Sequence, residues 1–112
     1  MANLKKSGTL SATKVELFSG DVGIVWISLG NQANTATTYL QIFDADSDDV
    51  TVGTTAPTLS IPIPASSAYD TAFAPPMVKI DFTNGCTVAA TTTRTGSTAP
   101  GTAVDYNFLL EV

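Results

Sequence analysis

The sequence predicts an all-β protein, an antiparallel β-sandwich of jelly-roll-like type with seven or eight short strands. Three features of its 112 residues favour this fold class. Several stretches alternate apolar and polar side chains with a period of two, as strands with one buried face do. Turn-forming residues separate these stretches about every 8 to 12 residues. The chain also holds 18 threonines, eight glycines and six prolines, which disfavour long helices.

The first predicted strand, Lys14–Phe18, ends at the turn signal Ser19-Gly20-Asp21. This turn predicts a hairpin with the next strand, Val22–Leu29. Simple alternation within that strand places Trp26 on the same face as Ile24. Three further apolar residues then share the opposite face: Val25, Ile27 and Leu29.

Both faces of Val22–Leu29 therefore carry apolar side chains. A strand of this kind lies centrally in a sandwich or packs against a neighbouring subunit. If a second subunit covers the strand, the candidate residues of that oligomer interface are Trp26, Ile27 and Leu29.

The same alternation predicts six further strands. They are Thr38–Asp44, Leu59–Pro64, Tyr69–Ala72, Val78–Phe82, Cys86–Thr92 and Val104–Val112. Because Pro62 and Pro64 lack the N–H that a ladder needs, their strand should lie at a sheet edge. The dipeptide Asn84-Gly85 suits a type I′ turn, which predicts a hairpin between the two strands that flank it. The last strand alternates most regularly, so we expect it to be locked into a sheet.

Residues 1–13 should form a flexible N-terminal arm, followed by a single sandwich domain over residues 14–112. The arm is polar and cationic and offers little beyond Leu4 and Leu10 to a hydrophobic core. Segments with so few apolar side chains remain unfolded until a partner orders them.

Charge is unevenly distributed along the chain. The first 14 residues carry three lysines and no acid, whereas residues 15–112 carry Lys79 and Arg94 against ten acids. A formal net charge of -5 argues against nucleic acid as a partner, because such binding needs cations along the phosphate backbone. The most apolar run, Val22–Leu29, is far shorter than the ~20 residues of a membrane-spanning helix, so no membrane partner is expected.

The sequence contains no histidine and a single cysteine, Cys86. The absence of histidine removes the commonest general base, the Ser-His-Asp triad and the usual zinc ligand. We therefore expect no enzymatic activity, no metal and no cofactor. Cys86 begins a strand of small residues with no cation beside it in the sequence, which favours a buried, inert thiol over a reactive one.

Two groups of side chains leave alternatives open. The acidic stretch that contains Asp44, Asp46, Asp48 and Asp49 favours a solvated turn, with weak divalent-ion binding or contact with a cationic partner as the alternatives. Four aromatic residues could line a sugar-binding face, although their places in apolar strand patterns favour packing. They are Trp26, Tyr39, Tyr69 and Tyr106.

The stretch from Tyr39 to Thr93 carries three motifs. They are YLQIFD with an acidic loop after it, VGTTAPTLSIPIPA (Val52–Ala65) and PPMVKIDFTNGCTVAATTT (Pro75–Thr93). In these motifs, which cover about half of the chain, the sequence resembles small β-rich virion proteins of tailed bacteriophages. Head decoration proteins, also called cement proteins, are among them.

The resemblance implies a non-enzymatic structural protein that is made in the host cytoplasm and becomes part of the virion. It would bind the outer surface of a capsid as a homo-trimer, with the major capsid protein as its partner, and would stabilise the shell. A cationic arm on an acidic body suits a shell with an acidic outer surface. The residues expected to contact the shell are Leu4, Lys5, Lys6 and Leu10.

Two other functions remain open at this stage. A tail, neck or fibre-base component of the virion would share the fold and composition but occur in few copies per particle. A small carbohydrate-binding β-sandwich module would bind glycans through its aromatic residues.

Overall fold

The computed structural model describes residues 3–72 and 79–112, and the backbone alone for residues 70–72. These residues form nine strands and one short 3₁₀ helix. In chain order the elements are β1 (Asn3–Leu10), β2 (Val15–Ser19), β3 (Val22–Gly30), β4 (Thr38–Phe43), η1 (Ser47–Asp49), β5 (Leu59–Ile63), β6 (Ala68–Ala72), β7 (Ile80–Phe82), β8 (Gly85–Thr91) and β9 (Val104–Glu111). Val78, the expected start of one strand, lies outside the described residues.

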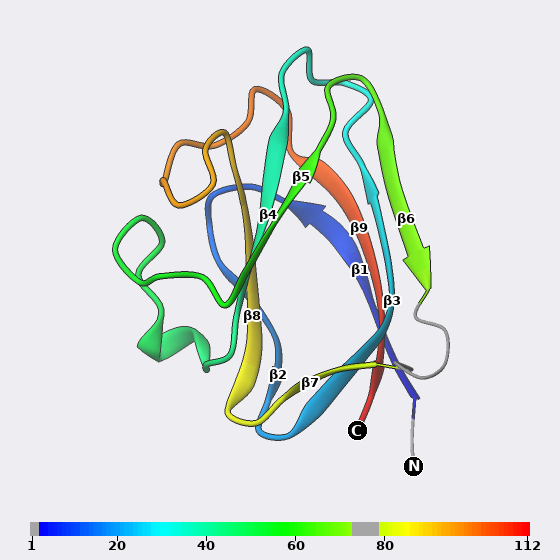
Figure 1. Cartoon of the computed structure of the whole chain (residues 1–112), viewed down its shortest axis with the longest axis vertical. Coiled ribbons are helices and arrows are strands. Elements are labelled where there is room, and N and C mark those ends of the chain that lie inside the picture. The colour runs from blue at the N-terminus through cyan, green and yellow to red at the C-terminus, as the bar shows by residue number, and fades with distance from the viewer. Residues whose placement is uncertain (1–2, 73–78) are drawn as a thin grey trace.

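The strands form two sheets that face each other, and every pairing is antiparallel (Figure 1). Sheet A has the strand order β1-β9-β3-β6, and β7 also pairs with β3. Sheet B has the order β2-β8-β4-β5, with the proline-containing β5 at an edge as predicted. The predicted all-β antiparallel sandwich is confirmed.

Strand pairing is nested along the chain. The first strand pairs with the last, β2 with β8, β3 with β6 and β7, and β4 with β5. The strands of each pair are thus brought together from progressively closer positions along the chain. Because the pairs join distant parts of the chain, the fold depends on long-range contacts.

The hydrophobic core lies between the two sheets. Along β9 the inward residues are buried and alternate with exposed Asp105 and Asn107, as the period-2 pattern predicts. Both sheets contribute large apolar side chains to the core, among them Leu17, Ile24, Ile42, Phe82, Val88 and Phe108. Cys86 lies in the same core, fully buried, as expected.

The N-terminal segment is not a flexible arm. Residues Asn3–Leu10 form β1 and pair with β9 along their whole length, from Asn3 opposite Glu111 to Leu10 opposite Val104. Leu10 is 0% exposed and belongs to the core. The prediction was wrong because β1 has few apolar side chains of its own. The regular strand β9 provides the backbone partner that orders it.

Both predicted hairpins are also wrong. The turn after β2 leads from sheet B to sheet A, and the turn at Asn84-Gly85 leads from β7 in sheet A to β8 in sheet B. The two turns meet at one end of the sandwich, where the Gly20 N–H donates to the Asn84 carbonyl oxygen at 3.3 Å. Turn-forming residues therefore marked the strand ends correctly, but they did not determine which strands pair.

A β-bulge changes the facing of residues in β3. The register with β9 shifts between Ile24, which lies opposite Leu110, and Trp26, which lies opposite Leu109. The extra residue, Val25, breaks the alternation, so Ile24 and Ile27 both face the core while Trp26 faces outward and is half-buried. The prediction that Trp26 shares a face with Ile24 is therefore wrong.

The outer face of sheet B is covered by the chain's own loops. All seven residues of β8 are buried, including those that face away from the core. The Thr87 hydroxyl donates to the Ala45 carbonyl oxygen at 2.8 Å, and Gln41 Nε2 donates to the Gly96 carbonyl oxygen at 3.0 Å. Phe43 lies on this outer face at 1% exposure. The segments 44–58 and 92–103, which lie beside β4 and β8 in Figure 1, thus form a third layer over sheet B.

Candidate docking surface

Three of the five cationic side chains have partners within the chain. Lys14 Nζ donates to the carbonyl oxygens of Ser47 and Val50, at 2.6 and 2.5 Å, and so ties β2 to the acidic turn. The Arg94 guanidinium lies 5.2 Å from the centroid of the Tyr39 ring and donates to the Ser60 carbonyl oxygen. These contacts hold loops onto the outer side of sheet B.

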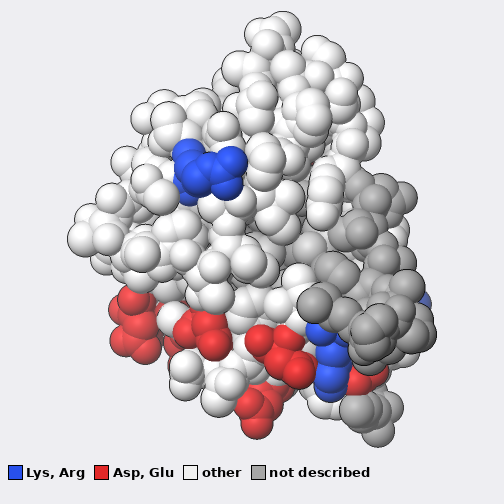
Figure 2. All heavy atoms as spheres, viewed as in Figure 1, with Lys and Arg blue, Asp and Glu red and all other residues white. Residues whose placement is uncertain are grey.

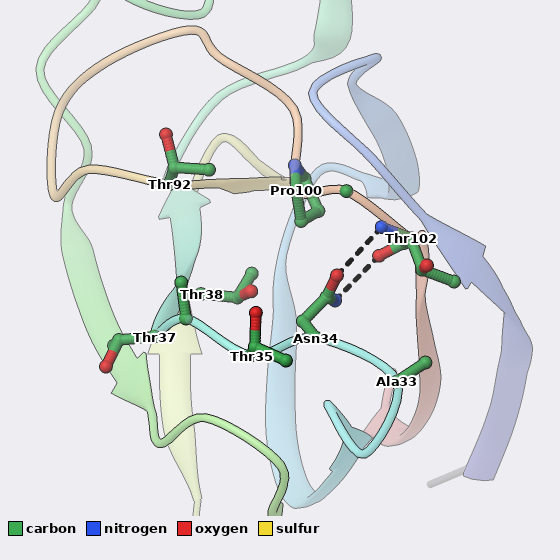
Figure 3. A pocket seen from close by; sticks show the side chains of 10 residues that line it. Ala33, Asn34, Thr35, Thr37, Thr38, Thr92, Pro100 and Thr102 are labelled. Carbon is green, nitrogen blue, oxygen red and sulfur yellow. Dashed lines mark hydrogen bonds between the residues drawn. The ribbon is translucent and has the colours of Figure 1, made fainter.

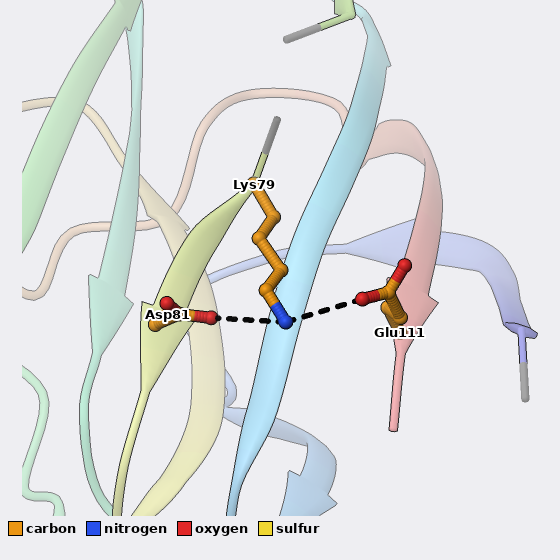
Figure 4. A network of polar contacts seen from close by, with 3 residues as sticks. All are labelled: Lys79, Asp81 and Glu111. Carbon is orange, nitrogen blue, oxygen red and sulfur yellow. Dashed lines mark hydrogen bonds and ion pairs between the residues drawn. The ribbon is translucent and has the colours of Figure 1, made fainter. Parts of the chain in front are cut away.

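Lys79 is the third of these cations. Its ammonium group lies 3.1 Å from Glu111 and 3.5 Å from Asp81 (Figure 4). The hydrogen bond with Glu111 raises the pKa of Lys79 above its usual value, so the ammonium stays charged. The contact joins β9 to the beginning of β7, across β3, and is a structural ion pair.

Lys5 and Lys6 differ from these three cations. Neither makes an ion pair or side-chain hydrogen bond with the part of the chain that the structure describes. Lys5 is exposed and Lys6 half-buried, both on β1 at the edge of sheet A. A groove of about 300 Å³ lies beside them. Its lining comes from β1, β3 and β9 and consists of Lys5, Lys6, Ser7, Trp26, Asn107, Phe108 and Leu109.

The strand register explains how this groove is built. Lys5 lies opposite Leu109 on β9, and Leu109 lies opposite Trp26 on β3. The three residues form one cross-strand row, in which neighbouring side chains lie about 5 Å apart. The next row holds Ser7, Asn107 and Ser28. The Lys5 ammonium group, two apolar side chains and neutral polar groups therefore lie together on the outer face of sheet A, with Glu111 in the row on the other side of Lys5. Lys6 lies opposite core-facing Phe108, so its side chain leaves β1 on the inward side of the sheet edge.

The structure separates the residues predicted to make contacts with partners. Leu10, Ile27 and Leu29 are at most 1% exposed, and the core uses them, so they cannot form a surface for the shell or for a second subunit. Leu4 is half-buried and packs against the core. Lys5, Lys6 and Trp26, predicted for two different interfaces, line one groove.

The sequence pattern did not identify Leu109 or Asn107 as residues of a contact surface, although both line the groove. Leu109 is an apolar residue on the otherwise polar face of the last strand, between inward-facing Phe108 and Leu110. This break in an otherwise regular alternation is the signal that could have identified an outward apolar contact. No such signal distinguishes Asn107.

The acidic stretch is an ordered turn. The Asp44 carboxylate accepts hydrogen bonds from the backbone N–H groups of Thr83 and Asn84, at 3.0 and 2.9 Å, and Asp48 and Asp49 lie exposed in η1. Acidic side chains gather at the lower end of the face shown in Figure 2. Among the described residues, no group of three or more acidic or cysteine side chains is placed to hold a metal ion. Asp48 and Asp49 are thus solvated, as the sequence favours for the whole stretch, whereas Asp44 is half-buried and holds the turn to the Thr83–Asn84 backbone.

A second hollow, of about 270 Å³, lies at the opposite end of the sandwich (Figure 3). Threonine side chains surround buried Asn34, whose amide group pairs with the backbone of Thr102 in both directions at 2.8 Å. Asn34 Nδ2 also donates to Asn31 Oδ1. The buried Asn34 side chain in this hollow therefore holds two loops together.

The remaining candidate groups have packing roles. Burial, together with a smaller contribution from the negative charge of Asp44, raises the pKa of the Cys86 thiol to about 12, so the thiol is protonated at neutral pH and unreactive. The aromatic residues proposed for sugar binding are not brought together. Tyr106 faces the core, Tyr39 the outer side of sheet B and Trp26 the outer side of sheet A.

No protein-family model, curated protein or solved structure matches this chain. Among the described residues, no helix is long and apolar enough to cross a membrane.

Proposed function

We propose that this protein is a non-enzymatic structural component of a bacteriophage virion that binds the outer surface of the capsid as a decoration protein. The resemblance in the segment Tyr39–Thr93 supports this proposal, and the observation that carries it is the groove on sheet A. There, Lys5, a cation without a partner in the described chain, lies beside outward apolar side chains on an otherwise acidic protein. Such a surface fits a partner with an acidic exterior.

Binding of this kind would stabilise the mature shell by mass action. A protein that binds the assembled shell, and not its dissociated subunits, shifts the equilibrium toward the shell. Homo-trimerisation and a site between neighbouring capsid subunits belong to this proposal. The major capsid protein is the partner, and the protein reaches the virion after synthesis in the host cytoplasm.

The deciding measurement is the number of copies of this chain in gradient-purified particles, determined by quantitative mass spectrometry against the major shell protein. A decoration protein should be present in hundreds of copies, comparable with the shell protein. A dozen copies or fewer would instead indicate a tail, neck or fibre-base component. Absence from the particles would contradict the virion function and leave the carbohydrate-binding module to be tested on a glycan array.

A further inference from the structure

The outer groove of sheet A combines three features that arise independently of one another. A bulge turns Trp26 outward, Lys5 lies in the same outward row without a partner in the described chain, and the loops that cover sheet B lie on the other side of the molecule. We propose that this groove binds an acidic segment of the shell protein that carries an apolar side chain next to a carboxylate. This inference rests on the proposed function and names the chemistry of the partner.

The bulge is the first observation. Regular alternation from Ile24 would point Trp26 into the core, and the extra residue Val25 reverses this. An inserted residue disrupts the ladder locally, and bulges are found where a side chain must be re-aimed. Here the result is that the single tryptophan of the chain borders an open groove. Aromatic side chains in such positions dominate many protein interfaces.

The lysines are the second observation. The chain has twice as many acids as cations, ten against five, yet Lys5 and Lys6 remain without an acidic partner in the described residues. The row next to Lys5 holds uncharged Ser7 and Asn107. The row on the other side of Lys5 holds Glu111, whose carboxylate is paired with Lys79. A carboxylate brought to Lys5 would therefore meet a positive charge with no unpaired acid in the neighbouring rows of the described chain. Charge complementarity of this kind favours an acidic partner and rejects a basic one.

The groove itself is the third observation. Leu109 and Trp26 lie side by side on the outer face, next to Lys5 in the same row. An apolar side chain seated against Trp26 and Leu109 would place a neighbouring carboxylate near Lys5 at the sheet edge. The groove would therefore recognise an apolar side chain and a carboxylate together, because the apolar contact positions the carboxylate and the ion pair positions the apolar side chain.

The test measures binding of the purified full chain to capsid shells that lack it, by co-sedimentation over a range of protein concentrations. The wild-type chain should bind and saturate, and binding should weaken as salt increases. Lys5→Glu should reduce the affinity at least about tenfold, because it places a carboxylate where the shell presents its own. Trp26→Ala should cause a loss of similar size through the apolar contact.

Arg94→Glu is the matched control, because it changes the net charge by the same amount. Arg94 stacks on Tyr39 at the outer face of sheet B, away from the groove. Its replacement should leave the affinity within about twofold of wild type, since salt screens a charge at that distance. An equal loss in Arg94→Glu and Lys5→Glu would overturn the inference, because the effect would then be one of net charge.

The remaining outcomes separate the inference from the function on which it rests. If wild type does not bind shells, the proposed function fails and the inference fails with it. If wild type binds and Lys5→Glu binds equally well, the function stands and the groove is not the site. Because Lys5 is exposed, this variant remains informative even if Trp26→Ala fails to fold. If Lys5→Glu dissociates an oligomer in sedimentation without shells, the groove is a subunit interface and the inference is overturned.

Discussion

The two outer faces of the sandwich contrast in what lies over them. On sheet B, loops 44–58 and 92–103 bury the outward residues, and hydrogen bonds from Gln41 and Thr87 fasten these loops down. On sheet A, outward residues of β1 and β9 such as Lys5 and Asn107 remain exposed. The chain thus covers one face with its own loops and leaves at the other a groove with the properties of a contact surface. Outward side chains on sheet B serve stability, whereas on sheet A Lys5 and Asn107 face solvent.

The strongest test of this contrast is Phe43→Ala. Phe43 is 1% exposed beneath the loops on sheet B, so its truncation should lower the free energy of unfolding by about 3–5 kcal/mol. Leu109→Ala on sheet A is the control and should cost about 1 kcal/mol or less, because Leu109 is only half-buried. Urea denaturation of both variants measures the difference. Equal losses would show that the two faces do not differ in this way.

Asn34→Ala tests how the covering loops are anchored. The substitution removes the paired hydrogen bonds to the Thr102 backbone and leaves buried polar groups without partners, which should cost about 1–3 kcal/mol. Amide hydrogen exchange should accelerate in segment 92–103 more than in β1. Asn107→Ala, an exposed amide on sheet A, should change neither quantity. Unchanged exchange in segment 92–103 of Asn34→Ala would contradict the anchoring role.

Cys86 provides a test of the hydrophobic core, which lies between the two sheets. The native pKa of about 12 lies above the usual 9.0, so the thiol ionises in the unfolded chain before it ionises in the native protein. Its contribution to stability is complete below about pH 9 and is lost as pH rises toward 12. The free energy of unfolding should therefore fall in this window more steeply for wild type than for Cys86→Ala. Identical slopes in urea titrations would contradict a buried thiol.

The smallest effect on stability is expected for Lys5→Glu. Lys5 is exposed and has no ion-pair partner among the described residues, so the free energy of unfolding should change by no more than about 0.5 kcal/mol. Thermal denaturation at two salt concentrations measures this. A large loss would mean that Lys5 supports the fold of β1, and it would remove the distinction between a structural face and a contact face.

Much of the strand content could be predicted from the sequence, because burial of one face imposes a period of two. The strands Val104–Glu111 and Leu59–Ile63 lie where the apolar–polar alternation places them. The second contains a proline and lies at a sheet edge, as predicted. The N-terminal strand was missed because Leu4 and Leu10 make too weak a pattern. Its order comes from pairing with β9, a strand about a hundred residues away.

The candidate site was predicted in pieces. Lys5, Lys6 and Trp26 were each identified from the sequence, but as parts of separate interfaces, and Leu10 and Ile27 were wrongly included. Periodicity does not reveal a bulge, because one inserted residue changes the facing of its neighbours without a clear signal in composition. The groove exists only where the register aligns Lys5, Leu109 and Trp26.

The sequence by itself determined the fold class, the positions of most strands and the buried state of Cys86, because these follow from local alternation and side-chain chemistry. The tertiary structure decided the strand partners, which turns cross from one sheet to the other, and the outward direction of Trp26. It also decided which outer face the loops cover. These features depend on backbone hydrogen bonds between segments far apart in the chain, and such bonds are made by groups that every residue type except proline shares.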